Sequence, residues 1–263
     1  MVKRRGNCVA RSSETGGVQS VSRAFIILES LADSGGFATI SQLAATTRIP
    51  LATIHRLLQT LVDEGYIRQE PSHRYALGSR LIRMGDVARR AHSVWAQPRL
   101  QDLVAEIGET ANLASLEGDA VVYVAQAPSP YAVRMFTEVG RRVSAHSTGV
   151  GKVLLARLDD DDVRRLVQRT GMPASTEHTI TTTAGLIQEL DRIRQLGYGV
   201  DEDEHELGVR CVAVALQDAP GNVAISVSGP SGRLTRERVA QIVPALQLVA
   251  AELGNELRHD RPA

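Results

Sequence analysis

Cysteine is almost absent from this sequence, and long hydrophobic runs are missing altogether. Only Cys8 and Cys211 occur among 263 residues, which excludes a disulfide framework and a cysteine-rich metal cluster. No apolar run approaches the roughly 20 residues that span a bilayer, and the basic residues 3–5 are not followed by the apolar core of a signal peptide. We therefore expect a cytoplasmic protein with no membrane partner, no metal site and no cofactor.

The sequence also lacks net charge, but the two halves differ. Residues 1–95 hold 13 Lys and Arg against 7 Asp and Glu, a balance of +6, whereas residues 96–263 hold 17 against 23, a balance of −6. The length favours two domains, and 43% hydrophobic with 23% charged residues argues against wholesale disorder. If the chain binds nucleic acid, its basic first half is the part that does so.

The chain begins with a segment of low hydrophobicity. Residues 1–18 predict a flexible basic tail, either simply disordered or an arm for the DNA minor groove. From Val21 onward, apolar residues recur at helical spacing until the turn at residues 33–36. This pattern predicts a first helix.

Two short helices in succession are predicted next. Thr39 and Gln42 have the spacing of a capping box, which indicates the start of a second helix. Pro50 opens a third helix without the loss of a backbone donor, and Gly65 ends it. One side of this third helix forms an apolar stripe: Ile54, Leu57, Leu58, Leu61 and Val62. Two helices separated by three or four residues, the second amphipathic, are typical of a helix-turn-helix.

The segment that follows has the pattern of a wing. Residues 66–78 predict a β-hairpin around the turn at 70–73, so residues 19–78 are interpreted as a winged helix-turn-helix DNA-binding domain. Residues 79–95 predict a basic connector helix, which we expect to contribute dimer contacts.

The face of the third helix opposite its apolar stripe is the expected DNA-reading surface. Thr53 and Arg56 lie near the helix start, where base edges and phosphates are usually contacted. Gln59 lies further along, so it contacts either an adenine edge or only a phosphate. The full set of expected DNA contacts is Thr39, Ala52, Thr53, His55, Arg56, Gln59 and, on the wing, Arg74.

Residues 96–263 alternate between strand and helix patterns, which favours an antiparallel α+β sensor-type domain. Helices are predicted near 99–108, 149–157, 160–170 and 184–196 and from about 235 onward. Strands are predicted at 111–116, 120–126, 209–217 and 222–228, with more extended chain at 133–143.

Several motifs of the second half carry competing interpretations. The run 146–152 fails as a phosphate loop because His146 and Val153 occupy positions that need glycine and Ser or Thr. The acidic run 201–206 predicts a solvated loop rather than a metal site. Cys211 predicts a buried apolar thiol rather than a nucleophile. Ser226 and Ser228 share one face of a strand, where they either line a cavity or face water.

Short motifs spread along the chain resemble the IclR family of bacterial regulators. In the first half they are 18–24, 53–61 and 64–66, and in the second half 149–156, 197–201, 208–211 and 226–230. Together they span essentially residues 18–258 in the family's order. The chain departs from the family at Leu51-Ala52, where relatives often have Lys-Ser, so operator preference does not transfer from them.

The resemblance implies a GAF-like effector-binding domain and a homodimeric or homotetrameric regulator, acting on double-stranded operator DNA. It also implies a small organic-acid or aromatic metabolite as effector, held by Gly149 and Val150 amides, by polar side chains and by an apolar wall. The full set of implied effector contacts is Met135, Gly149, Val150, Asp201, Val209, Cys211, Ser226 and Ser228. Repression and activation remain equally open.

Two other function classes compete with this interpretation. An enzyme would need a nucleophile or acid-base pair supported by a third group, and no such motif is present in the sequence. A nonspecific architectural DNA binder would bind any duplex at similar strength, whereas a regulator prefers its own operator.

Overall fold

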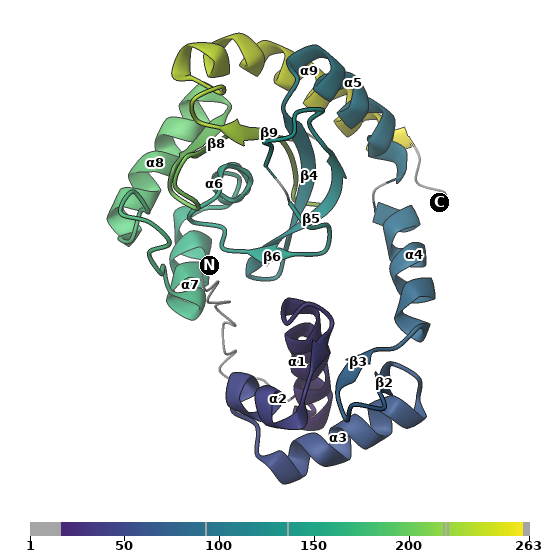
Figure 1. Cartoon of the computed structure of the whole chain (residues 1–263). Helices are drawn as coiled ribbons and strands as arrows, with labels where there is room; N and C mark the ends of the chain where they lie inside the picture. Colours follow the sequence, from purple (N-terminus) through teal and green to yellow (C-terminus); the bar gives the residue numbers. More distant parts are fainter. Residues whose placement is uncertain (1–16, 93, 136, 218, 220, 260–263) are drawn as a thin grey trace. The chain divides into compact units, whose positions relative to one another are not determined.

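The computed structural model describes residues 17–92, 94–135, 137–217, 219 and 221–259. Residues 1–16, which hold Cys8 and most of the predicted basic tail, lie outside that part. The chain divides into two compact units between Ala88 and Arg89, and each unit is described by itself (Figure 1).

The first unit is a small helical domain with a three-stranded sheet. Its elements are α1 (Gln19–Asp33), β1 (Phe37–Ala38), α2 (Ile40–Thr47), α3 (Leu51–Asp63), β2 (Ile67–Gln69), β3 (Tyr75–Leu77) and α4 (Arg80–His92), the last of which crosses the unit boundary. The sheet is antiparallel in the order β1-β3-β2. The core joins α1, α2 and α3 to β2 through fully buried Ile27, Leu43, Ile54, Leu58 and Ile67.

The predicted start and turn of the helix-turn-helix are confirmed. The Thr39 hydroxyl accepts the Gln42 N–H at 3.3 Å, and the Gln42 side chain accepts the Thr39 N–H at 2.8 Å, which completes the capping box. Arg48 ends α2 in the left-handed region at φ 57°, and this reversal allows α3 to begin after Pro50. The predicted wing is β2 and β3, closed by the bond from the His73 N–H to the Glu70 carbonyl at 3.0 Å.

The second unit is built on a six-stranded antiparallel sheet. The strands are β4 (Thr110–Glu117), β5 (Ala120–Ala127), β6 (Arg142–Val143), β7 (Gly199–Glu202), β8 (Val209–Ala215) and β9 (Val223–Pro230), in the order β6-β5-β4-β9-β8-β7. The helices are α5 (Gln97–Ile107), α6 (Gly149–Leu155), α7 (Asp160–Thr170), α8 (Thr183–Leu196) and α9 (Arg236–His259), and a 3-10 turn η1 (Val94–Ala96) precedes α5.

Helices cover both faces of this sheet (Figure 1). On one face α5 and α9 pack against large apolar residues of β4, β8 and β9, such as Leu113 and Ile225. On the other face α6 and α8 form a second core above small residues of the sheet, such as Ala213 and Ala224. Small residues let α6 approach closely: a Cβ on Gly149 would lie 3.1 Å from the Cys211 Sγ atom. This close approach places the start of α6 against the sheet.

Most predicted elements of the second half are confirmed within two or three residues, and three differences stand out along the whole chain. Among the described residues of the segment 133–143, only Arg142–Val143 forms a strand. Strands β1 and β7 were not predicted, because β1 has two residues and β7 ends within the acidic run. Such short strands form through their pairing partners rather than through a pattern of their own.

Candidate functional site

The expected DNA-reading face of α3 is accessible. Ala52, His55 and Arg56 are exposed and Thr53 is half-buried, while Ile54 and Leu58 face the core. Leu51, at the position where the chain departs from its family, is 54% exposed, so it is not a core residue of the unit. The helix therefore presents small and polar groups around one arginine.

The polar side chains of this face differ in how they are held. The Arg56 guanidinium makes no ion pair or hydrogen bond with the described residues; the Thr60 hydroxyl donates to the Arg56 carbonyl at 3.1 Å. Gln59 donates from Nε2 to Asp63 at 2.9 Å, which ties it to its own helix. Arg56 is thus the group most ready to reach DNA.

The two expected contacts outside α3 lie in different surroundings. Thr39 is half-buried, and its hydroxyl already serves the capping box. Arg74 is exposed at the wing, and its guanidinium lies 5.1 Å from the centre of the Phe37 ring. This stacking supports Arg74 at the start of β3 and leaves its N–H groups at the surface.

The expected effector contacts gather at one end of the sheet. Strand register places Asp201 opposite Cys211, and Cys211 opposite Ser228, so the three side chains share the face that α6 covers. Ser226 lies on the same face two residues from Ser228, and both hydroxyls are buried. Because both hydroxyls are buried, the two serines do not face water, which was one of the two alternatives for this strand face.

The remaining expected contacts surround this group. Gly149 packs against Cys211, and Val209 shares the face of Cys211 two residues away, half-buried. Met135 is also half-buried, and its carbonyl accepts the Thr110 hydroxyl at 3.1 Å. Val150 is fully buried in the core beneath α6, so only its backbone is placed to face a ligand.

Burial controls the protonation of this group. Burial raises the pKa of the Cys211 thiol to about 11, and the prediction of a buried thiol is confirmed. Burial also raises the pKa of Asp201 to about 7, while the N–H groups of Glu204 and His205 donate to its carboxylate at 2.8 and 3.3 Å and lower that pKa. Near neutral pH, therefore, Asp201 can carry or release a proton.

One buried hydroxyl of the group has no partner. Ser226 is fully buried, and its Oγ makes no hydrogen bond of normal geometry with the described residues. It lies near enough to Cys211 to lower that thiol's pKa in part, as Ser228 does. The Ser226 hydroxyl, like those of Ser30 and Ser147, thus keeps hydrogen-bonding capacity that the described residues do not use.

The prediction of a solvated loop for the acidic run is wrong at two residues. Asp201 belongs to β7, and both Asp201 and Glu204 are buried. Lys152 of α6 explains this burial, because its ammonium group donates to the Val200 carbonyl at 2.6 Å and pairs with the Glu204 carboxylate. No local pattern marks Lys152 as this partner, because 52 residues separate it from Glu204.

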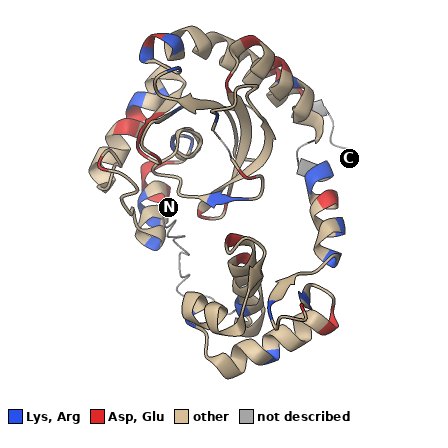
Figure 2. Ribbon diagram, in the orientation of Figure 1, with Lys and Arg blue, Asp and Glu red and all other residues tan. Residues whose placement is uncertain are grey.

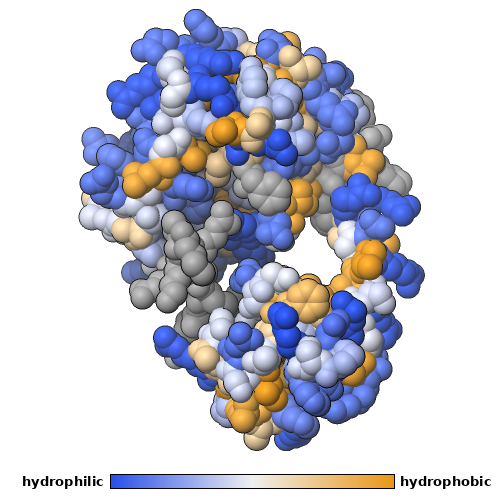
Figure 3. Space-filling view, viewed as in Figure 1, coloured by the Kyte–Doolittle hydropathy of each residue, from blue (hydrophilic) through white to orange (hydrophobic). Residues whose placement is uncertain are grey.

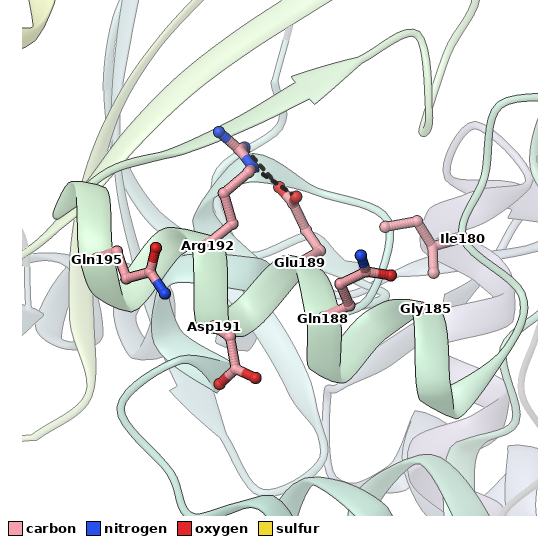
Figure 4. Close-up of a pocket in the computed structure, with 7 residues that line it drawn as sticks. All are labelled: Ile180, Gly185, Gln188, Glu189, Asp191, Arg192 and Gln195. Atoms are coloured by element: carbon pink, nitrogen blue, oxygen red, sulfur yellow. Dashed lines mark hydrogen bonds and ion pairs between the residues drawn. The ribbon is translucent and has the colours of Figure 1, made fainter.

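A groove of about 480 Å³ runs along α8, lined by Ile180, Gly185, Gln188, Glu189, Asp191, Arg192 and Gln195 (Figure 4). None of its lining residues is an expected effector contact, and Arg192 pairs with Glu189 three residues earlier on the same helix (Figure 4). Among the described residues, no cluster of His, Cys, Asp and Glu is suited to a metal ion, and no helix is long and apolar enough to cross a membrane.

Comparison with known proteins agrees with both units. The model of the IclR helix-turn-helix domain matches residues 20–71, and that of the bacterial transcriptional regulator IclR C-terminal domain matches residues 88–255. The transcriptional repressor IclR of Escherichia coli is 34% identical over 262 residues, which cover 95% of each chain.

Solved structures show the same architecture. The IclR transcriptional regulator of Alicyclobacillus acidocaldarius has a TM-score of 0.79 and 29% identity, over 91% of this chain and 98% of that one. An IclR homolog from Microbacterium hydrocarbonoxydans, solved with 4-hydroxybenzoate, has a TM-score of 0.75 and 22% identity, over 92% and 100% of the two chains, and supports the fold alone. With a family model across most of its length and a curated repressor at 34% identity, this chain belongs to the IclR family of bacterial transcription regulators.

Proposed function

We propose that this regulator binds its operator in a sequence-specific way, and that a small carboxylic acid or aromatic metabolite modulates the binding from the polar end of the second unit's sheet. The observation that carries the proposal is the fully buried Ser226 hydroxyl, which has no partner among the described residues and lies beside Cys211 and Ser228. A distant relative of the same fold was solved with 4-hydroxybenzoate, which is an acid of the proposed class.

The donors on this face suit a carboxylate. Hydroxyl groups and the first amides of α6 can hydrogen-bond to its oxygens. The Gly151 N–H is already taken by the Thr148 hydroxyl at 3.2 Å, whereas the Gly149 and Val150 amides precede it and have no acceptor within the helix. Val209 and Met135 supply apolar wall.

On the DNA side, we propose that α3 enters the major groove and the wing follows the backbone. Arg56 is the leading contact, supported by Ala52, Thr53, His55 and Gln59 of α3, and Arg74 contacts the adjacent phosphates. Thr39 contributes as the cap of α2, where its hydroxyl accepts the Gln42 N–H and can donate its own proton to a phosphate. Such binding occurs in the cytoplasm, where the operator is.

We further propose that the regulator acts as a homodimer or homotetramer. Two recognition helices must reach adjacent half-sites of an operator, and an effector that binds one arrangement better shifts the population toward it. Along α4, basic residues alternate with exposed apolar ones (Figures 2 and 3), including Met84 and Val87 one helical turn apart. A second copy would cover this apolar stripe.

The proposal is tested with the full chain and a duplex selected for tight binding from random sequence. Fluorescence anisotropy should show the selected duplex bound about a thousandfold or more tightly than a scrambled one. A panel of aliphatic and aromatic carboxylates, 4-hydroxybenzoate included, should contain a compound that changes operator affinity without being consumed. Equal affinity for both duplexes would instead identify a nonspecific DNA binder.

A further inference from the structure

Asn112 is a fully buried polar residue for which neither the sequence nor the family resemblance gave a role. It lies on β4, directly opposite Ser226 of β9 on one side and Gln126 of β5 on the other. Residues opposite each other in an antiparallel sheet share a face, so the Asn112 side chain lies on the face of the proposed effector site.

The Asn112 carboxamide is held on one side and loosely engaged on the other. Its Oδ1 atom accepts a hydrogen bond from the Gln126 Nε2 atom at 3.1 Å. Its Nδ2 atom donates to the Ser228 hydroxyl at 3.4 Å, near the limit for a hydrogen bond. Gln126 therefore fixes the carboxamide with its NH2 group toward the two serines.

The donor capacity at this point is not used up. A carboxamide NH2 has two protons, and a serine hydroxyl has one. The Asn112 NH2 group makes one long bond among the described residues, and the Ser226 hydroxyl makes none. The second Nδ2 proton of Asn112 and the Ser226 hydroxyl, on facing buried residues, thus have no acceptor of normal geometry among the described residues.

We propose that Asn112 Nδ2 and Ser226 Oγ form an acceptor-oxygen subsite, which donates two hydrogen bonds to one oxygen of the effector's carboxylate. The inference rests on the proposed function, namely that an organic acid binds on this face. Asn112 is then a specificity-determining contact and Gln126 is its positioning residue. Because both donors are neutral and fixed, the subsite favours a carboxylate oxygen over an NH2 group.

The substitution Asn112→Asp tests the subsite with almost no change in shape. It keeps the oxygen that accepts from Gln126 and replaces the NH2 group with a second oxygen. At a pH where the new carboxyl group is ionised, a carboxylate ligand meets a like charge, whereas the NH2 group of a primary amide meets an acceptor. The preference for an acid over its amide should fall at least tenfold, an effect that a purely structural role of Asn112 would not produce.

The experiment uses the full chain and matched probes: acetate, pyruvate, lactate, benzoate and 4-hydroxybenzoate, each with its primary amide. Thermal shift finds the acids that bind the wild-type chain, and calorimetry gives their affinities for Asn112→Asp and Ser226→Ala. Ser226→Ala guards against a folding defect of the first variant, since it removes a hydroxyl without a partner and should lower acid affinity about tenfold at unchanged thermal stability. Ser115→Ala, on the other face of β4, is the matched control.

The possible outcomes distinguish failure of the subsite from failure of the proposed function. Loss of acid affinity in both variants, with the acid-to-amide preference reduced in Asn112→Asp, supports the subsite. If an acid binds the wild-type chain and both variants keep its affinity within threefold, the subsite is wrong while the proposed function stands. If no acid of the panel stabilises the wild-type chain, the proposed function fails and the subsite with it.

Discussion

The Lys152 ammonium group forms an ion pair with the Glu204 carboxylate inside the second unit, where the lysine side chain is 1% exposed. The pair joins α6 to the segment after β7, and the Val200 carbonyl and the Glu189 carboxylate complete the surroundings of the ammonium group. Asp201 accepts the Glu204 N–H, so the same contacts brace the proposed effector site.

Replacement of this lysine should therefore be costly. Lys152→Met leaves buried carboxylates without their cation and should lower the free energy of unfolding by about 3 to 5 kcal/mol. Urea unfolding of the full chain measures the loss. Arg164→Ala, which removes an exposed pair with Asp161, should cost less than about 1 kcal/mol. Equal effects of the two substitutions would contradict the importance assigned to the buried pair.

The raised pKa of Asp201 predicts a pH dependence of stability. Its pKa is about 7 in the folded chain against 3.8 for an ordinary aspartate, so the folded state binds the extra proton between these values. The contribution of this group to the unfolding free energy is complete below about pH 4 and falls as the pH rises toward 7. Asp201→Asn should remove this pH-dependent loss of stability. The unfolding free energy of the variant should therefore rise relative to that of the wild-type chain between pH 4 and pH 7.

The difference in unfolding free energy between the two chains, measured at pH 4, 5.5, 7 and 8, checks this sign. The comparison cancels the opposite contribution of His146 and His205, whose pKa values burial lowers in both chains. A constant difference across the range would show that Asp201 does not titrate as described.

The wing depends on a glycine that has no room for a side chain. A Cβ on Gly78 would lie 2.2 Å from the Gly65 carbonyl oxygen, so Gly78→Ala must displace the backbone where β3 ends. We expect a loss of about 3 kcal/mol in unfolding free energy. The control is Gly85→Ala on α4, where a Cβ meets nothing within 4 Å and should stabilise the helix by about 0.5 to 1 kcal/mol. Circular dichroism melts should show a lower melting temperature for Gly78→Ala and a higher one for Gly85→Ala. If neither substitution changed the melting temperature, the close approach at Gly78 would be contradicted.

The apolar stripe of α4 should matter for assembly. Val87 is 60% exposed, and Val87→Glu would place a charge where a second copy is proposed to pack. Light scattering at micromolar concentration should show a lower mass for this variant. Leu248→Glu on α9, also at an exposed apolar residue, should leave the mass unchanged. If the Val87→Glu variant keeps the wild-type mass, the second copy does not pack on the apolar stripe of α4.

Local patterns in the sequence predicted the first unit well, because its helices depend on contacts between neighbours in the chain. The capping pair Thr39 and Gln42 is three residues apart, and the stripe of α3 repeats at helical spacing. The polar end of the sheet depends on register instead. Asn112 meets Ser226 from 114 positions away, and nothing in the surrounding apolar stretch marks it apart from its alternation with Ala111 and Leu113.

The same limit explains the error in the acidic run. A charged stretch is solvated unless a distant cation enters it, and Lys152 lies in the helix predicted near 149–157, far from the acidic run in sequence. Only the closeness of α6 to the sheet brings that cation to Glu204. The contacts implied by the family resemblance include Asp201, which lies on β7 opposite Cys211, but they include neither Lys152 nor Asn112.

The central claim is that α3 reads a specific DNA sequence through Arg56, and the most direct measurement is the affinity of Arg56→Ala for the selected duplex and for a scrambled one. The account predicts a loss of about 1 to 3 kcal/mol on the selected duplex and a much smaller loss on the scrambled one, so specificity falls at least tenfold. Arg164→Ala in the second unit should change neither affinity. Unchanged affinity and specificity in Arg56→Ala would show that residues 52–60 are not the reading surface.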